Sequence, residues 1–409
     1  MEQPSPPRAS WIPCADGLRA TAAAAVFLHH ASFLTGVTFH SRAGAFFARF
    51  DIGVPVFFAL SGFLLSRPYL DAILDDRPLP DWRAFYRRRV LRIIPAYWVA
   101  LTATYVWLRP DSATQAHGVD YPLHYLLLQI YPAGTFPRGI SPAWTLAVEA
   151  TFYAALPALA VLAYRFLRPV GTTSRRALSL LGLLAAAGVG SLAYRSVLYG
   201  VGHPLQAVLW LPGMAGEFAV GIGIATLASW ARRRAVARPV TELLGRHDLL
   251  WWTLAALLLI FQSTQIGLER GLAHANWDRE LYSELIRIAI ATCLLLPVAF
   301  GPQDRGVVRR VLRSWPVASF GVISYGVFLW HVPLIEAVVN WTGRHPFLDW
   351  TRPGMGLLSR DVVVPVALAF AASVVAGTLS WFVVEKPLIR LGGGRRRARL
   401  AEPTAKAAP

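Results

Sequence analysis

The sequence predicts an all-α membrane protein, a polytopic bundle of about ten transmembrane helices. Its 409 residues are 55% hydrophobic and only 15% charged, and the mean hydropathy is +0.45. Soluble domains carry about a quarter charged residues, so this composition argues against an ordinary soluble protein. Apolar stretches of about twenty residues also recur along the chain, and this is the length with which a helix crosses the hydrocarbon core.

The apolar stretches have the length of helices, and only helices and closed barrels can span lipid. The first stretch follows a polar, proline-rich segment whose single basic residue is Arg8. It is too long for a signal peptide and lacks a convincing cleavage site, so we expect a retained first helix. The expected spans are residues 19–38, 52–70, 91–108, 143–164, 178–198, 206–229, 248–266, 282–300, 317–339 and 361–384.

The arginines are concentrated in alternate connections, and this sets the expected orientation. The basic connections are 66–92, 165–176, 230–246 and 302–314. The connections between them, near 39–50, 109–142, 199–205, 267–281 and 340–359, hold few basic residues. By the positive-inside rule the basic set is cytoplasmic, and an even number of spans places both termini there as well.

Three segments follow from this division. We expect a cytoplasmic N-terminal segment over 1–18, a transmembrane domain over 19–390 and a basic, disordered cytoplasmic tail over 391–409. The net charge of +17 would by itself suggest a nucleic-acid partner. The basic residues are instead distributed connection by connection, which excludes that class and favours contact with anionic lipid headgroups.

The first expected span carries a polar stripe. Arg19 and His30 are eleven residues apart, which brings them within about 20° of one another on a helix and roughly 16 Å apart along its axis. His29 points about 80° away, and we expect it to pack. A neutral imidazole is tolerated inside a membrane and can accept the proton of an attacking hydroxyl. The structural alternative for His30 is a histidine hydrogen-bonded between helices.

An arginine cluster precedes the third expected span. Arg87, Arg88, Arg89 and Arg92 fix the topology by holding this end of the span in the cytoplasm. Arg89 and Arg92 are three residues apart and therefore neighbours on one helix face. Two guanidinium groups at this spacing can also clamp a phosphate.

Further polar residues lie in other spans. Glu149 and Tyr153 are four residues apart and share a helix face, which makes them a plausible polar wall for a hydroxyl acceptor; the alternative for Glu149 is a structural ion pair. His331 lies toward the outer end of its span, where we expect an interfacial or acceptor-side role. Ser61 is expected, with its neighbour Gly62, to allow close helix packing. The sequence Glu385-Lys386-Pro387 is expected to end the last span, and the two cysteines show no disulfide or metal spacing.

Six stretches together resemble a known family. In chain order they are "DGLRATAAAAVFLHH", "GVPVFFALSGFLL", "FYRRRVLRIIPAYW", "PAWTLAVEATFY", "ISYGVFLWHVPL" and "LSWFVVEKPL". They are similar to the integral-membrane acyltransferase 3 family, whose members transfer acyl groups to sugars, glycolipids, cell-surface polysaccharides and some antibiotics. The resemblance covers residues 17 to about 390, and the chain ends soon afterwards, so we expect no extracellular hydrolase-like extension.

The resemblance implies roles for individual residues. The family's signature of an arginine, ten residues and a histidine matches Arg19 and His30, which implies that His30 is the catalytic base. The family's Arg-x-x-Arg motif matches Arg89 and Arg92, which implies contact with the nucleotide phosphates of coenzyme A. Arg19, also near the cytoplasmic edge, is expected to serve the same donor. The residues that match the family pattern on the expected acceptor side are Trp144, Glu149 and Tyr153.

The sequence therefore predicts a membrane O-acyltransferase. We expect acyl-CoA as a co-substrate, with no permanently bound cofactor or metal, and a hydroxyl acceptor on a glycan, glycolipid or antibiotic-like molecule. The absence of a nucleophile elbow favours direct transfer over an acyl-enzyme. The alternative function is a transporter or flippase for a lipid-linked sugar or small polar solute, although no inverted repeat is evident.

Overall fold

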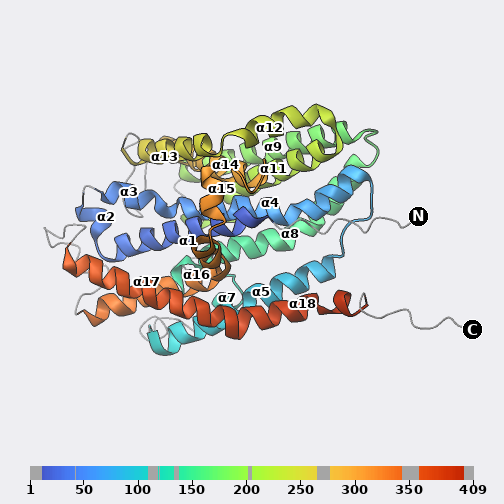
Figure 1. The fold of residues 1–409 in the computed structure, drawn as a ribbon. Coiled ribbons are helices and arrows are strands. Elements are labelled where there is room, and N and C mark those ends of the chain that lie inside the picture. Colours follow the sequence, from blue (N-terminus) through green and yellow to red (C-terminus); the bar gives the residue numbers. More distant parts are fainter. Residues whose placement is uncertain are drawn as a thin grey trace, which may run out of the picture.

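The computed structural model describes residues 12–41, 43–108, 118, 120–132, 138–200, 205–264, 277–342 and 359–399. These residues form helices and no strands, as predicted. The long helices lie side by side in one bundle (Figure 1). Of the expected external connections, 267–281 and 340–359 lie largely outside the described residues, whereas 109–142 is described at 118, 120–132 and 138–142.

The helices follow one another along the chain. Their bounds are α1 (Pro13–Leu34), α2 (Val37–His40), α3 (Gly44–Ala48), η1 (Arg49–Ile52), α4 (Gly53–Asp75), α5 (Trp82–Ala103), η2 (Thr104–Leu108), α7 (Asp120–Tyr125), η3 (Ser141–Ala143), α8 (Trp144–Leu167), α9 (Thr173–Gly200), α10 (Leu205–Val208), η4 (Leu211–Met214), α11 (Ala215–Arg233), η5 (Ala235–Ala237), α12 (Arg238–Arg246), α13 (Asp248–Thr264), α14 (Trp277–Ala299), α15 (Val307–Leu312), α16 (Trp315–Trp341), α17 (Arg360–Ser380), η6 (Trp381–Glu385) and α18 (Lys386–Arg399).

The described residues contain eight helices that are long and apolar enough to cross a membrane, or nine if α12 and α13, bent by 66°, count as one span. Of the ten expected spans, the one outside this set is the first, helix α1, which is 22 residues long. The polar side chains of α1, among them Arg19 and two adjacent histidines, lower its hydropathy below that of the other long helices. A helix of this kind is stable in a membrane when protein surrounds its polar face.

Exposed tryptophans lie at both ends of two of the long helices. Trp315 and Trp341 are exposed at the two ends of α16, and Trp82 and Trp107 are exposed near the two ends of the α5–η2 helix. Amphipathic indole rings collect at both membrane–water interfaces. In Figure 1 the α4–α5 and α8–α9 connections and the end of α18 lie together on the right, while α2 and α3 lie at the opposite end.

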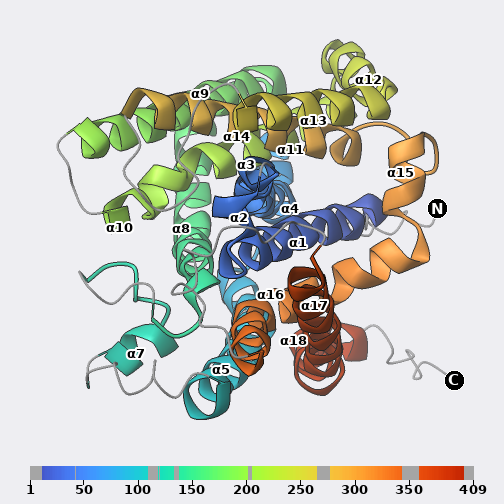
Figure 2. The same ribbon diagram turned by 90° about the vertical axis from the view of Figure 1, so that its left-hand side faces the viewer.

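The first helix lies inside the bundle. Seen from the end of the bundle in Figure 2, α1 runs between α4 and α16, and it packs along both. The contact with α16 is close and depends on a glycine. A Cβ on Gly321 would lie only 1.8 Å from the carbonyl oxygen of Asp16, so a larger side chain would clash there. Gly62 has the corresponding role between α4 and α11, where a Cβ would lie 2.5 Å from the Phe218 carbonyl oxygen. The close packing expected from Gly62 is thereby confirmed.

The end of the last span differs from our expectation. The Glu385-Lys386-Pro387 sequence does not end the helix, because α17 continues through the π-helical turn η6 into α18. Pro387 follows this wider turn, where the α-helical hydrogen-bond pattern is already interrupted, so its missing N–H is tolerated. Helix α18 reaches Arg399, inside the segment 391–409 that we expected to be a tail; residues 400–409 lie outside the described part.

Candidate active site

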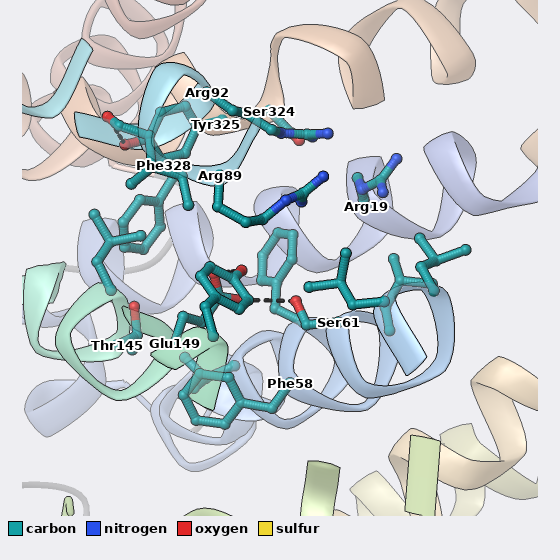
Figure 3. A pocket seen from close by; sticks show the side chains of 18 residues that line it. Arg19, Phe58, Ser61, Arg89, Arg92, Thr145, Glu149, Ser324, Tyr325 and Phe328 are labelled. Atoms are coloured by element: carbon teal, nitrogen blue, oxygen red, sulfur yellow. Dashed lines mark hydrogen bonds between the residues drawn. The ribbon is translucent and has the colours of Figure 1, made fainter. Parts of the chain in front are cut away.

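A cavity of about 110 Å³ lies inside the bundle between α1, α4, α5, α8 and α16 (Figure 3). Its wall is mostly apolar on one side and carries polar side chains from all five helices. The polar residues on the wall are Arg19, Ser61, Arg89, Arg92, Thr145, Glu149, Tyr153, Ser324 and Tyr325. The five predicted residues Arg19, Arg89, Arg92, Glu149 and Tyr153 are thus brought together, although they come from three separate helices.

Three arginines converge on this cavity. Figure 3 shows the guanidinium groups of Arg19, Arg89 and Arg92 pointing toward a common space. Arg19 is paired with Asp16, one turn earlier on α1. Among the described residues, Arg89 and Arg92 make no hydrogen bond or ion pair, and Nε of Arg89 is buried without a partner. A buried charge without a partner is costly, so this arrangement favours an anionic ligand.

A half-buried carboxylate lies opposite the arginines. Glu149 accepts a hydrogen bond from Ser61 Oγ at 3.0 Å and another from the hydroxyl of Tyr153 at 2.5 Å. Both donors are neutral, so the ion pair considered as an alternative for Glu149 is not seen among the described residues. The hydrogen bonds fix the carboxylate within the cavity wall, where the charges of Arg89 and Arg92 act on it.

Ser61 was misinterpreted from the sequence. We expected this residue only to allow close packing, but its hydroxyl is the link between α4 and Glu149 on α8. Ser324 and Tyr325 were missed altogether; both line the cavity, and the Tyr325 hydroxyl donates to the carbonyl oxygen of Ile93 at 2.8 Å. The signal was present in the quoted stretches "ALSGF" and "ISYG", as hydroxyl groups within apolar spans.

Two histidines from distant parts of the chain meet beside the cavity. His331 Nδ1 lies 2.6 Å from the Phe328 carbonyl oxygen, and His30 Nδ1 lies 2.9 Å from the Val26 carbonyl oxygen. A carbonyl only accepts, so in the neutral rings both Nδ1 atoms carry the hydrogen. Nε2 of His331, 3.1 Å from Nδ1 of His30, can then share that hydrogen. This leaves Nε2 of His30 with a free lone pair, and none of the described residues bonds to it.

Phe328 separates the histidine pair from the cavity. Its side chain lines the cavity, its carbonyl accepts from His331, and its ring lies 5.8 Å from the His331 ring. Neither His30 nor His331 lines the cavity itself. The cavity, which Arg19 lines, and the histidine pair, which contains His30, therefore lie on the two sides of Phe328.

The remaining candidates have packing contacts. His29 Nδ1 lies 3.1 Å from the Ala48 carbonyl oxygen, which agrees with the structural role we expect for His29. The Trp144 ring packs edge-on against Phe58, with ring centroids 6.4 Å apart, and it does not line the cavity. No group of three or more histidine, cysteine or carboxylate side chains within the described ranges is arranged to hold a metal ion.

The fold and the site define a class of protein. The chain is a membrane-embedded helical bundle with an internal, arginine-lined cavity next to a histidine whose Nε2 is unoccupied. The model of the acyltransferase 3 family, described as an acyltransferase domain, matches residues 12–385. The chain belongs to this family and is a membrane protein.

Several named proteins are similar to this chain over most of its length. The peptidoglycan O-acetyltransferase OatA of Listeria monocytogenes is 24% identical over 93% of this chain, and this chain spans 56% of the length of that relative. Nodulation protein 10 of Rhizobium leguminosarum is 24% identical over 83% of this chain and 82% of its own length. Acyltransferase MdmB of Streptomyces mycarofaciens is 27% identical over 99% of this chain and 98% of its own length. No solved structure matches the chain.

Proposed function

We propose that this protein is a membrane O-acyltransferase that transfers a short acyl group from acyl-CoA to a hydroxyl of a carbohydrate acceptor. The observation that carries the proposal is the pair of unpartnered guanidinium groups, Arg89 and Arg92, facing an internal cavity. Such a pair calls for a ligand with several negative charges, and the phosphates of coenzyme A supply them.

The donor end of the reaction uses the arginines. Arg89 and Arg92 hold phosphate oxygens of the donor, and Arg19, paired with Asp16, adds positive charge to the same cavity. From Arg19 to His30 is roughly 16 Å along a helix, comparable to the reach of an extended pantetheine arm. The thioester then lies near Phe328, at the boundary between the cavity and the histidine pair.

The chemical step uses the histidine pair. Nε2 of His30 takes the proton of the acceptor hydroxyl while the hydroxyl oxygen attacks the thioester carbonyl carbon. The carbon–sulfur bond breaks, and the proton passes from His30 to the thiolate of coenzyme A. His331 Nε2 faces Nδ1 of His30 at 3.1 Å and stabilises the positive charge that forms on that ring. No covalent acyl-enzyme is needed.

The name of one relative supports a proposal for the acceptor. The Listeria relative is named for peptidoglycan O-acetylation. We accordingly propose a hydroxyl of a cell-surface polysaccharide such as peptidoglycan as the acceptor, approached from the side of His30 that faces away from the arginines. A glycolipid and an antibiotic-like molecule are tested as alternative acceptors.

The test is release of free coenzyme A thiol together with ester formation. Purified protein in detergent is given acetyl-CoA and a panel of acceptors: peptidoglycan fragments, a glycolipid and a hydroxyl-bearing antibiotic. We expect thiol release that depends on acceptor and is lost in His30→Gln at matched folded amounts. No thiol release with any acceptor, combined with solute flux in vesicles, would contradict the proposal and favour a transporter.

A further inference from the structure

A groove runs along the side of α1 that is turned away from the arginine-lined cavity. It has a volume of about 640 Å³, lies between α1, η1, α4, α13, α14, α16 and α17, and meets a second hollow of about 530 Å³ at Leu28. On α1 it is lined by residues that include Leu18, Thr21, Ala25 and Leu28, which follow the spacing of one helix face. Leu28 comes nine residues after Arg19, which turns it about 180° away from that side chain.

The groove is apolar and has the depth of one membrane leaflet. From Leu18 to Leu28 it covers roughly 15 Å of α1, about half of the ~30 Å hydrocarbon core. Among the residues that line it, the one hydroxyl, on Thr21, donates within its own helix to the Gly17 carbonyl oxygen at 3.1 Å. Seen from the end of the bundle in Figure 2, α13 and α17 lie on either side of α1. The bilayer core holds no water, so a hollow of this kind is filled by hydrocarbon chains.

One end of the groove carries an unused hydrogen-bond donor. Trp252, in the second turn of α13, lines the groove, and its indole N–H is buried with no acceptor among the described residues. The neighbouring Trp251 donates instead to the Leu244 carbonyl oxygen at 2.8 Å. Leu18 and Pro316 also lie near the starts of their helices, and α15 contacts α1, α13 and α16. A buried donor without an acceptor is costly, so this end favours a ligand that supplies one.

The same end of the groove is positively charged. Arg246, Arg310 and Arg313 are exposed and form no ion pair with any residue that the structure describes. Arg313 comes three residues before Pro316, which lines the groove. By the positive-inside rule we expect this end to be cytoplasmic, where anionic lipid headgroups attract basic residues. A glycerophospholipid would bring a chain for the groove, an ester carbonyl for Trp252 and a negative charge for the arginines.

We propose that the groove binds an anionic glycerophospholipid of the adjacent leaflet, whose acyl chain packs behind α1 and holds Arg19 and His30 in position. Arg19 faces the cavity from one side of the helix, and the acyl chain fills the hollow on the other side. A filled groove therefore restricts rotation and tilting of α1. The binding site does not depend on the proposed reaction; the effect on turnover rests on the proposed function.

The test measures phospholipid binding to the purified protein. Delipidated protein in detergent is titrated with phosphatidylglycerol and, separately, with phosphatidylcholine, and bound lipid is counted by native mass spectrometry. We expect phosphatidylglycerol to bind about tenfold more tightly at low salt, because basic residues near the headgroup attract its charge. High salt should reduce this preference, because exposed charges are screened.

Variants of the groove test where the lipid binds. Trp252→Phe keeps an aromatic ring and removes the donor, so we expect the Kd for phosphatidylglycerol to rise about fivefold. Ala25→Leu places a larger side chain in the groove and should reduce retention further. Ala186→Leu makes the same change on the exposed side of α9 and should bind as the parent does. If Ala25→Leu does not fold, Trp252→Phe decides, with Trp107→Phe, at an exposed tryptophan of η2, as its control.

The outcomes separate the lipid site from the proposed reaction. Equal binding of the two phospholipids, or parent-like binding in Trp252→Phe and Ala25→Leu, would overturn the site. Tighter binding of a polyprenyl phosphate than of phosphatidylglycerol would overturn the choice of a glycerophospholipid. Phosphatidylglycerol should also raise the kcat of the delipidated parent, and binding without any change in turnover would overturn the positioning of α1. If the parent transfers no acyl group to any acceptor, the proposed function fails, while lipid binding still decides whether the site exists.

Discussion

Two clusters of arginines inside the bundle differ in their counterions. In the first cluster, at the C-terminal end of α9 and the N-terminal end of α14, Arg195 lies 3.2 Å from Glu284, and Arg287 lies 2.9 Å from Asp51 and 3.7 Å from Glu284. In the second cluster, around the cavity, Arg89 and Arg92 have no such partner among the described residues. The two clusters use the same residue type.

The difference shows how a binding site can be told from a structural ion network. Arg195 and Arg287 join α9, α14 and η1 through their carboxylates, so their charges are satisfied within the protein. Arg89 and Arg92 leave their charges to be satisfied from outside it. Changes in the cluster of Arg195 and Arg287 should therefore affect the fold, whereas changes around the cavity and its neighbouring histidines should affect the reaction.

The largest effect on the reaction is expected at His30. His30→Gln keeps hydrogen bonding but cannot act as a base near neutral pH, and His30→Ala removes the ring. General-base catalysis contributes about 100- to 10,000-fold in rate, so we expect kcat to fall by that factor in both variants. Turnover is measured at matched folded amounts in detergent. Activity near that of the parent in either variant would leave His30 as a packing residue.

Changes in the cluster of Arg195 and Arg287 should instead lower the stability of the protein. Glu284→Gln removes the carboxylate that lies between Arg195 and Arg287, leaving two buried guanidinium groups with less negative charge. Breaking a buried ion pair costs about 3 kcal/mol or more, so we expect a lower melting temperature in detergent and a lower folded yield. The KM for acyl-CoA of the folded fraction should stay unchanged. A raised KM with normal stability would mean that this cluster also binds a substrate.

The cavity arginines should respond in donor binding. Arg89→Gln and Arg92→Gln each remove charge-assisted hydrogen bonds to phosphate, and we expect the KM for acyl-CoA to rise about ten- to a hundredfold. Melting temperatures should stay level or rise, because an unbalanced buried charge has been removed. Arg88→Gln, one position away on the exposed side of α5, is the matched control. A collapse of folded yield at constant KM would make the pair structural.

The fold was more predictable than the site. The helices follow from local sequence, whereas the site depends on contacts between residues that are far apart in the chain. Hydropathy is a local property, so the long helices could be located from the sequence. The sequence predicted α1 as a span with a polar stripe, but not which helices enclose it, because its contacts with α4 and α16 are not revealed by the segment itself. The π-turn that carries the helix past Pro387 depends in the same way on packing against α5.

For the site, helical spacing correctly paired residues within one helix. Glu149 and Tyr153, four residues apart, are hydrogen-bonded to each other. Contacts between helices were not predictable, because Ser61 and Glu149 are 88 positions apart and His30 and His331 are 301 apart. No periodicity extends over such a separation. Ser61 was therefore assigned to packing, and the pairing of the two histidines was not foreseen.

The smallest effect is expected at His29, and it tests how α1 is rotated. His29 and His30 are adjacent, with ring centroids 4.9 Å apart, but His29 is hydrogen-bonded to the Ala48 carbonyl while His30 faces His331. His29→Ala removes one hydrogen bond, which contributes about 1 kcal/mol to stability, and leaves Nε2 of His30 in place. We expect a slightly lower melting temperature and a kcat within about threefold of the parent. His29→Gln, which can restore a donor to the Ala48 carbonyl, should recover part of the stability. If His29→Ala instead loses as much activity as His30→Ala, the two rings act as one unit, and the assignment of the base to His30 alone would be wrong.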